Sequence, residues 1–255
     1  MQYTLKKSLG QHFLKDENIS RKIVAALQQT MADTGIASVL EVGPGAGALT
    51  KYLLQLPGID FKAVELDDEK VQYLENTFKA ISNKIIHQSF LDIDPPFEKA
   101  FIVVGNFPYN ISTQIVFKII EWKAQVPVMI GMFQKEVAQR IASKPGSKVY
   151  GIMSVLVQAY YDVEYLFDVT PGSFNPPPKV MSGVIKLKLK TTLPEITSER
   201  AFFVLVKTAF NQRRKTLRNA VKALFSEEVL KDEIFNKRAE QLTIQDFTSL
   251  TFKMK

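Results

Sequence analysis

The stretch Asn106-Phe107-Pro108-Tyr109 combines groups that can act together on an amine. The side-chain oxygen of Asn106 and the backbone carbonyl of Pro108 can each accept a hydrogen bond from an exocyclic amine. The ring of Tyr109 can stack on the base that carries this amine. A proline turn with two core aromatics is the commoner role of such a stretch. The rest of the chain decides between these two interpretations.

The elements expected around this stretch place it at the edge of a sheet. Residues 101–105 are short, apolar and rich in β-branched side chains, which predicts a buried strand that ends directly before Asn106. Ligand sites of open parallel sheets lie at the carboxyl ends of the strands. Periodicity and turn residues predict further strands at 37–42, 61–64, 84–88, 127–133, 163–169 and 180–189. They also predict a first helix that is capped by Asn18, and helices at 48–54, 113–122, 134–142 and 152–161.

The alternation of strands and helices predicts a mostly parallel α/β sheet with helices on both faces. After Lys190 the pattern changes: residues 191–194 are typical of a linker, and only helical periodicity follows, including a last helix capped by Thr243. We therefore predict one α/β domain over 1–190 and a small all-α domain over 191–255.

A glycine-rich turn and a distant carboxylate predict a nucleoside site. Gly43, Gly45 and Gly47 follow the first strand directly and lead into a helix, so the backbone can approach a ligand closely. Glu65 ends the second strand about 20 residues later, where a carboxylate can bind ribose hydroxyls. The usual dinucleotide spacing is not met and no phosphate-loop lysine follows. The pattern alone does not decide between a dinucleotide and S-adenosylmethionine.

Composition favours a polyanionic partner. The 255-residue chain has a formal charge of +7, which points to nucleic acid first and an anionic membrane second. It has no cysteine and only two histidines, so we expect no metal site, and it has no apolar run long enough for a membrane span. No signal peptide is recognisable, and we expect a cytoplasmic protein.

Four cations lie within six residues near the start of an expected helix. A solvated helix face is the usual role of such a charge run. In a basic protein, however, this density favours contact with RNA phosphates. The predicted RNA-binding residues are Arg213, Arg214, Lys215 and Arg218.

Several motifs together resemble one family. Leu-Gly-Gln-His-Phe-Leu at 9–14, Glu-Val-Gly-Pro-Gly-Ala-Gly at 41–47, Asn-Phe-Pro-Tyr-Asn-Ile-Ser at 106–112, Phe-Asn-Pro-Pro-Pro-Lys-Val at 174–180 and Phe-Asn-Gln-Arg-Arg-Lys-Thr-Leu-Arg-Asn at 210–219 occur in the family's order. The chain is thus similar to the small-subunit (16S) rRNA adenine-N6 dimethyltransferases of the KsgA / RsmA type. This resemblance implies a Rossmann-like methyltransferase sheet, and S-adenosyl-L-methionine as the cofactor.

The resemblance also implies the residues that bind the cofactor, which are Gln11, His12, Leu14, Gly43, Gly45, Glu65, Ser89 and Asn106. Two of these positions depart from the family. His12 stands where the family usually has Asn, and Ser89 stands where it usually has Asp near the adenine amine of the cofactor. We expect that second contact to be lost, bridged by water or shifted to Asp92.

The implied reaction is dimethylation of two adjacent adenines in the 3′-terminal hairpin of small-subunit rRNA, within a pre-ribosomal particle, by a monomeric enzyme. Asn106, Pro108 and Tyr109 would be catalytic, with the Asn106 oxygen and the Pro108 carbonyl accepting the two hydrogens of the target amine. Tyr109 would stack on the flipped-out base. Phe174 is a candidate for the opposite face of the base, or else a loop anchor packed on the sheet.

Two alternatives stay open at this point. A large-subunit rRNA adenine methyltransferase of the macrolide-resistance type shares the fold and the Asn-x-Pro-Tyr element, but its C-terminal half lacks the motif at 210–219. A non-catalytic ribosome-assembly or RNA-binding factor on the same fold is the other alternative. The intact stretch from Asn106 to Tyr109 argues against lost activity.

Overall fold

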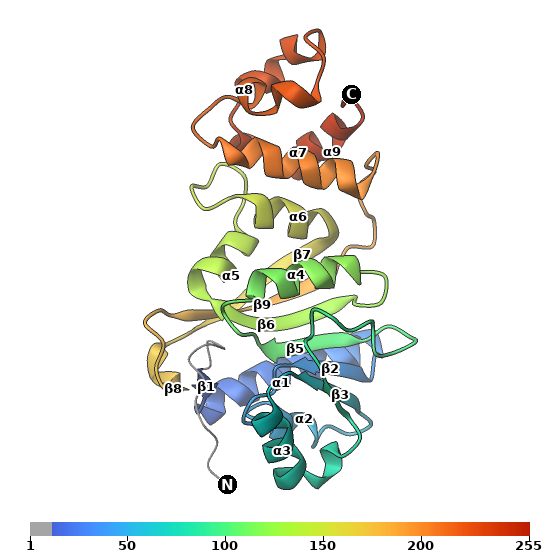
Figure 1. Ribbon diagram of the computed structural model, residues 1–255, viewed down its shortest axis with the longest axis vertical. Helices are drawn as coiled ribbons and strands as arrows, with labels where there is room; N and C mark the ends of the chain where they lie inside the picture. The colour runs from blue at the N-terminus through green and yellow to red at the C-terminus, as the bar shows by residue number, and fades with distance from the viewer. Residues whose placement is uncertain (1–11) are drawn as a thin grey trace. The chain divides into compact units, whose positions relative to one another are not determined.

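The computed structural model describes residues 12–255, and its contacts divide the chain into two compact units (Figure 1). The first unit contains the chain up to Ala138 together with Glu164–Leu189. The second contains Gln139–Val163 and Lys190–Lys255. Residues 139–163 thus group with the C-terminal helices, whereas the predicted 1–190 domain includes them. The division into domains at residue 190 stays a prediction.

A seven-stranded sheet forms the centre of the first unit, in the order β4-β3-β2-β5-β6-β9-β7. The pairs β2–β3, β3–β4, β2–β5 and β5–β6 are parallel, and β9 runs antiparallel to β6 (Figure 1). This arrangement confirms the predicted α/β class. The strands are β2 (Ser38–Val42), β3 (Asp60–Glu65), β4 (Ile85–His87), β5 (Ile102–Asn106), β6 (Val128–Gln134), β7 (Tyr161–Val169) and β9 (Ser182–Leu189). A separate two-stranded pair joins β1 (Phe13–Leu14) to β8 (Phe174–Asn175).

The helices follow the predicted periodicity with small shifts at their ends. The first helix begins at Glu17 and is capped by Asp16, whose carboxylate accepts a hydrogen bond from the Asn18 backbone N–H. The prediction that Asn18 is the cap is therefore wrong by two residues. The α-helices are α1 (Glu17–Thr34), α2 (Thr50–Leu53), α3 (Asp68–Thr77), α4 (Ser112–Glu121), α5 (Lys135–Ala142), α6 (Ile152–Tyr160), α7 (Glu199–Asn211), α8 (Leu217–Val221) and α9 (Ile244–Thr251).

The side chains of the central strands alternate between the two faces of the sheet and are buried on both. In β5, Ile102 and Val104 belong to one core cluster together with Leu27 of α1. Val103 between them is equally buried but points to the opposite face. Near-continuous apolar strands such as 102–104 are typical of parallel sheets covered on both sides.

The second unit is helical and has its own aromatic core. Phe210 of α7 lies 5.9 Å from Phe247 of α9 and 6.1 Å from Tyr150, measured between ring centroids. Thr243 caps α9 by accepting a hydrogen bond from the Asp246 backbone N–H, as predicted. The helix after the basic cluster begins only at Leu217, so residues 212–216 form a turn between two helices and do not open a helix.

Candidate active site

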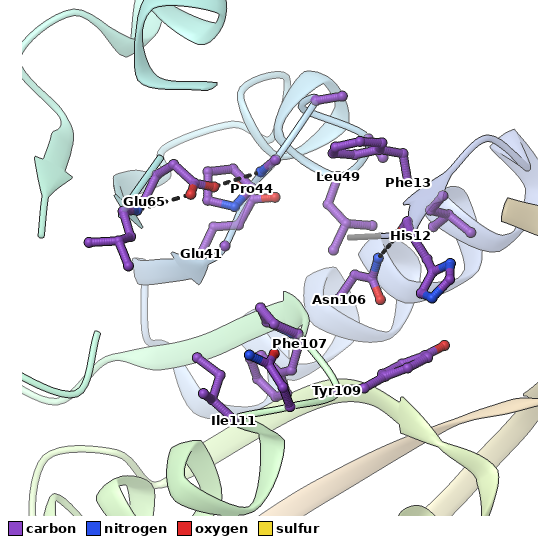
Figure 2. A pocket seen from close by; sticks show the side chains of 18 of the residues that line it. His12, Phe13, Glu41, Pro44, Leu49, Glu65, Asn106, Phe107, Tyr109 and Ile111 are labelled. Carbon is purple, nitrogen blue, oxygen red and sulfur yellow. Dashed lines mark hydrogen bonds between the residues drawn. The ribbon is translucent and has the colours of Figure 1, made fainter. Parts of the chain in front are cut away.

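A cavity of about 220 Å³ lies at the carboxyl ends of β2, β3 and β5 (Figure 2). Parallel strands end at the same edge of a sheet, so the loops that follow them meet there. Nine of the predicted site residues line this one cavity although they come from five separate stretches of sequence. They are His12, Leu14, Gly43, Gly45, Glu65, Ser89, Asn106, Pro108 and Tyr109.

The loop after β5 is held by a ring that rests on two glycines. Gly105 of β5 and Gly131 of β6 are partners in the parallel register. A Cβ atom added to Gly105 would lie 2.7 Å from the Phe107 ring, and one added to Gly131 would collide with the same ring. Phe107 is buried and packs edge-on against Phe133, with 5.1 Å between ring centroids. The paired glycines therefore fix Phe107, and with it the residues on either side.

Asn106 ends β5 with its amide oriented by the N-terminal strand. Its Nδ2 atom donates a hydrogen bond to the backbone oxygen of His12 at 3.3 Å, which leaves Oδ1 as a free acceptor. The Pro108 carbonyl accepts one hydrogen bond, from the Ile111 N–H at 3.2 Å. A carbonyl oxygen has two lone pairs, so one acceptor position remains on Pro108. The two acceptors that the sequence predicts are thus present.

The Tyr109 ring is held at both its edge and its side. Its hydroxyl lies 2.5 Å from the Oγ atom of Ser182, a buried residue of β9. Its centroid lies 5.7 Å from that of the His12 ring. Burial raises the pKa of the Tyr109 hydroxyl, so it is neutral at physiological pH. The contact with Ser182 therefore fixes the position of the ring.

The glycine turn and Glu65 are joined by hydrogen bonds. One carboxylate oxygen of Glu65 accepts the Gly45 N–H at 3.1 Å, and the other accepts the backbone N–H groups of Leu66 and Asp67. Burial raises the pKa of Glu65, and these hydrogen bonds act in the opposite direction. Of about four acceptor positions on a carboxylate, three are used, so one is left on the oxygen that accepts from Gly45. Glu65 lines the cavity, and a ribose hydroxyl can bind at this position.

The shape of the turn fits a nucleoside that lies against its backbone. Gly43 and Gly45 have φ angles of +66° and +57°, which disfavour any residue with a side chain. A Cβ atom at Gly43 would lie 3.6 Å from Cδ of Pro108. The turn thus comes close to the loop after β5, and Gly43, Glu65 and Asn106 line the same cavity.

Glu41, which belongs to the motif at 41–47 and for which the sequence favours a structural role, also lines the cavity. It is buried and accepts a hydrogen bond from the Thr50 hydroxyl at 2.7 Å. Burial, opposed by this hydrogen bond, raises the pKa of Glu41 to about 8. The side chain is therefore mostly protonated at neutral pH. Glu41 is the second-last residue of the buried strand β2, and nothing in the sequence distinguishes it from a structural residue.

Three predicted residues, Gln11, Ser89 and Phe174, differ in how the structure places them. Gln11 lies outside the described residues. Ser89 lines the cavity, and its hydroxyl accepts a hydrogen bond from the Leu91 N–H at 3.2 Å. Phe174 is only 1% exposed and belongs to the hydrophobic core, where it pairs with Leu14 between β8 and β1. A ring buried to this extent presents no free face to a base, so the loop-anchor interpretation describes its position.

Apolar side chains that line the cavity were also missed. Leu66 follows Glu65 and is 56% exposed, which is unusual for a large apolar residue. Leu91 and Phe13 line the same cavity. A flat apolar group such as a nucleobase can pack against them. The exposure of Leu66 is visible only in three dimensions, although its position directly after Glu65 was available in the sequence.

The basic cluster lies in the second unit, and its members have different surroundings. Arg213 donates hydrogen bonds from Nη2 to the backbone oxygens of Lys148 and Tyr150 at 2.8 and 2.9 Å. Arg218 donates from Nε to the backbone oxygen of Leu230 at 3.0 Å. Arg214 and Lys215 are exposed. Two of the four cations thus stabilise the fold of their own unit.

Residues 12–255 contain no helix that is both long and apolar enough for a membrane span. Within the same residues, no three His, Asp or Glu side chains come together in a way that suits a metal ion.

Comparison with known proteins defines the class and then the family. A dimethyladenosine transferase from Plasmodium falciparum matches the structure with a TM-score of 0.78 and 26% identity, over 94% of this chain and 96% of that one. The 23S rRNA methyltransferase ErmE shares the fold at a TM-score of 0.67 and 22% identity, over 94% and 99% of the two chains. Together with the nucleoside cavity, this fold defines an S-adenosylmethionine-dependent methyltransferase.

The sequence narrows the class further. The family model described as ribosomal RNA adenine dimethylase matches residues 2–253. The ribosomal RNA small subunit methyltransferase A of Flavobacterium johnsoniae is 51% identical over 254 residues, which cover 98% of this chain and 95% of that relative. The chain belongs to the ribosomal RNA adenine dimethylase family.

Proposed function

We propose that this enzyme transfers methyl groups from S-adenosylmethionine to the N6 amines of two adjacent adenines in the 3′-terminal hairpin of small-subunit rRNA. The observation that carries the proposal is the adjacency of the Gly43 turn and Pro108 across one cavity, which brings a nucleoside site next to two amine acceptors. The name of the Flavobacterium johnsoniae relative supports the small subunit as the source of the rRNA.

The chemistry requires positioning more than proton transfer. The exocyclic amine of adenine is a poor nucleophile because its lone pair is delocalised into the ring. Oδ1 of Asn106 and the Pro108 carbonyl would accept hydrogen bonds from its two N–H groups, draw the nitrogen towards tetrahedral geometry and free the lone pair. The nitrogen would form a bond to the methyl carbon as the carbon–sulfur bond breaks, and it would then lose one proton to solvent. When bound, S-adenosylmethionine supplies a methyl group activated by a sulfonium. Holding the two reactants in line then contributes most of the rate.

The other residues of the cavity hold the two substrates. Glu65 would bind the ribose hydroxyls of the cofactor, while Gly43 and Gly45 give its methionine portion access to the backbone. His12, Leu14 and Ser89 line the same space, and Gln11 would complete this set. The Tyr109 ring, which Ser182 fixes in place, would stack on the flipped-out adenine.

The rRNA would be bound outside the cavity by the second unit. Arg214 and Lys215 are exposed and would contact phosphates, whereas Arg213 and Arg218 would contribute part of their charge while they hold backbone carbonyls. We propose that the enzyme acts as a monomer in the cytoplasm, on a pre-ribosomal small subunit.

Transfer of labelled methyl groups from S-adenosylmethionine tests the proposed function. Immature small subunits, free small-subunit rRNA and large-subunit precursors would be compared as acceptors. We expect label in adenines of the small-subunit substrates only. Label only in the large-subunit precursor would overturn the proposal, and cofactor binding without transfer to any acceptor would favour a non-catalytic assembly factor.

Asn106→Ala tests the proposed clamp directly. Loss of the Oδ1 acceptor should lower turnover roughly 10²–10³-fold, the usual effect of removing one group that stabilises a transition state. Binding of the rRNA hairpin, measured by filter retention, should stay within about twofold because Asn106 carries no charge and is not among the proposed phosphate-binding residues. Near-normal turnover in this variant would remove Asn106 from the mechanism.

A further inference from the structure

The His12 side chain lies next to the Tyr109 ring, to which the proposed function assigns the target base. The ring centroids are 5.7 Å apart and the planes are tilted by 32°. Figure 2 shows the His12 ring and the Asn106 amide beside one another, above the Tyr109 ring in that view. The target amine must reach Asn106, so the base has to approach Tyr109 in the region that His12 borders.

The His12 ring is fixed in this place from two directions. Its Nδ1 atom lies 2.9 Å from the backbone oxygen of Pro176. A carbonyl only accepts, so Nδ1 carries the hydrogen and donates it. The backbone of the same strand is held as well, because the Lys15 N–H donates to the Ser173 oxygen at 2.9 Å. The ring is thus tied to the segment around β8 and not only to its own strand.

The space between the two rings is too small for a base. Stacked carbon atoms sit about 3.5 Å apart at their closest favourable distance, so a base between two rings needs them roughly 7 Å apart. The observed 5.7 Å falls short of this separation. A base that stacks on the side of Tyr109 next to His12 therefore requires the His12 ring to move aside.

We propose that His12 is a positioning residue for substrate entry: its ring covers Tyr109 in the RNA-free enzyme and is displaced by the flipped-out adenine. This inference rests on the proposed function, since it takes Tyr109 as the stacking residue. Where the resembling family has Asn, no ring is available for this role, so the property belongs to this chain's own residue.

The test uses a hairpin RNA with two adjacent loop adenines, one of which is replaced by the fluorescent base 2-aminopurine. Titrating the full-length enzyme in the presence of S-adenosylhomocysteine, which blocks transfer, reports base capture as a change in emission. The quantity compared is the enzyme concentration at half of the full change. Cofactor binding is measured separately by calorimetry, because His12 also lines the cofactor cavity.

His12→Ala and His12→Asn should both reach half of the emission change at a lower enzyme concentration. One aromatic contact no longer has to be broken, which corresponds to roughly a two- to tenfold decrease. Binding of an unlabelled duplex RNA without loop adenines should not change. An unaltered half-point in both variants would overturn the inference, and so would a higher one, because His12 would then support the bound base as a second wall.

Tyr109→Ala distinguishes the proposed stacking of the base on Tyr109 from the proposed displacement of His12. If this variant keeps the full emission change, Tyr109 does not stack on the base and that part of the proposed function fails. If Tyr109→Ala loses the change while the two His12 variants match the unaltered enzyme, the proposed function stands and only the role of His12 fails. Thermal unfolding of each variant confirms that the comparison is made on folded protein.

Discussion

The loop from Asn106 to Tyr109 and the basic cluster at 213–218 are both short polar motifs, but the fold treats them differently. The loop follows a buried strand, and the buried ring of Phe107 rests on Gly105 and Gly131. Its polar groups therefore keep acceptor positions free. The cluster occupies a turn where Arg213 donates to two backbone carbonyls of its own unit. Arg213 of the cluster is thus partly used to hold the fold together. In the loop, the glycines beneath Phe107 have this structural role, and the polar groups do not.

The comparison indicates that polar groups keep free acceptor positions only where nonpolar neighbours hold the backbone in place. The loop depends on two glycines and a phenylalanine to set the direction of an amide. In the cluster, Arg213 binds the turn to the backbone of Lys148, and Arg218 of α8 donates to the backbone of Leu230. Variants in the two regions should separate these effects.

The largest expected effect on stability is at Gly131, which lies against the Phe107 ring. A methyl group in Gly131→Ala would collide with the Phe107 ring, and overpacking of this kind costs about 1–3 kcal/mol of unfolding free energy. We expect about 3 kcal/mol here because two rigid groups, the sheet and the ring, must give way. Denaturant unfolding measures the loss, and turnover should fall with it.

Gly172→Ala is the matched control for that variant, because no atom lies within 4 Å of a Cβ added there. Its stability should change by less than about 0.5 kcal/mol. Equal losses in the two variants would mean that alanine at a glycine position, and not the contact with Phe107, is responsible.

The next effect is the pH dependence of the unfolding free energy that arises from Glu41, a buried residue of the cavity. The folded-state pKa of Glu41 is raised from 4.5 to about 8, so the folded protein binds this proton more tightly than the unfolded chain does. Its contribution to stability is full below pH 4.5 and is lost as the pH rises towards 8, at up to about 1.4 kcal/mol for each pH unit. Glu41→Gln should remove this slope in denaturant unfolding measured between pH 5 and pH 8. An identical slope in the two proteins would contradict the assignment to Glu41.

A smaller effect distinguishes the members of the basic cluster. Arg213→Ala should cost about 1 kcal/mol of unfolding free energy, since it loses the hydrogen bonds to Lys148 and Tyr150. Arg214→Ala should leave stability within about 0.5 kcal/mol. It should instead weaken hairpin binding and reduce the dependence of log K on log salt by about one. If hairpin binding and its salt dependence are unchanged in Arg214→Ala, Arg214 does not bind RNA and is a solvated surface residue.

The fold could be predicted from the sequence because its signals are local. The apolar runs, the turn at 43–47 and the change of pattern after Lys190 each depend on neighbouring residues. The parallel order and the shared edge of the strands then follow from general rules of α/β topology. The error at Asn18 has the same origin, since Asp16 and Asn18 are both good caps and only the structure shows which side chain turns towards the helix.

Much of the site could be predicted for the same reason, and the misses share another cause. Glu41 and Leu66 are defined by burial and exposure, which depend on residues far away in the chain. Phe174 belongs to a motif, yet its pairing with Leu14 turns the ring into the core. Gly131 carries no motif at all, and only its register with Gly105 gives it a role. Long-range packing of this kind leaves no local pattern.

The pairing of β1 with β8 also has a consequence for biosynthesis. The contact between His12 and Pro176 joins residues that are 164 positions apart. During translation the glycine turn and the Asn106 loop are complete long before residue 176 leaves the ribosome. The N-terminal strand therefore waits without its partner until most of the first unit exists. A nascent chain that ends before Phe174 would contain both halves of the catalytic cavity but would lack the strand that secures its N-terminal wall.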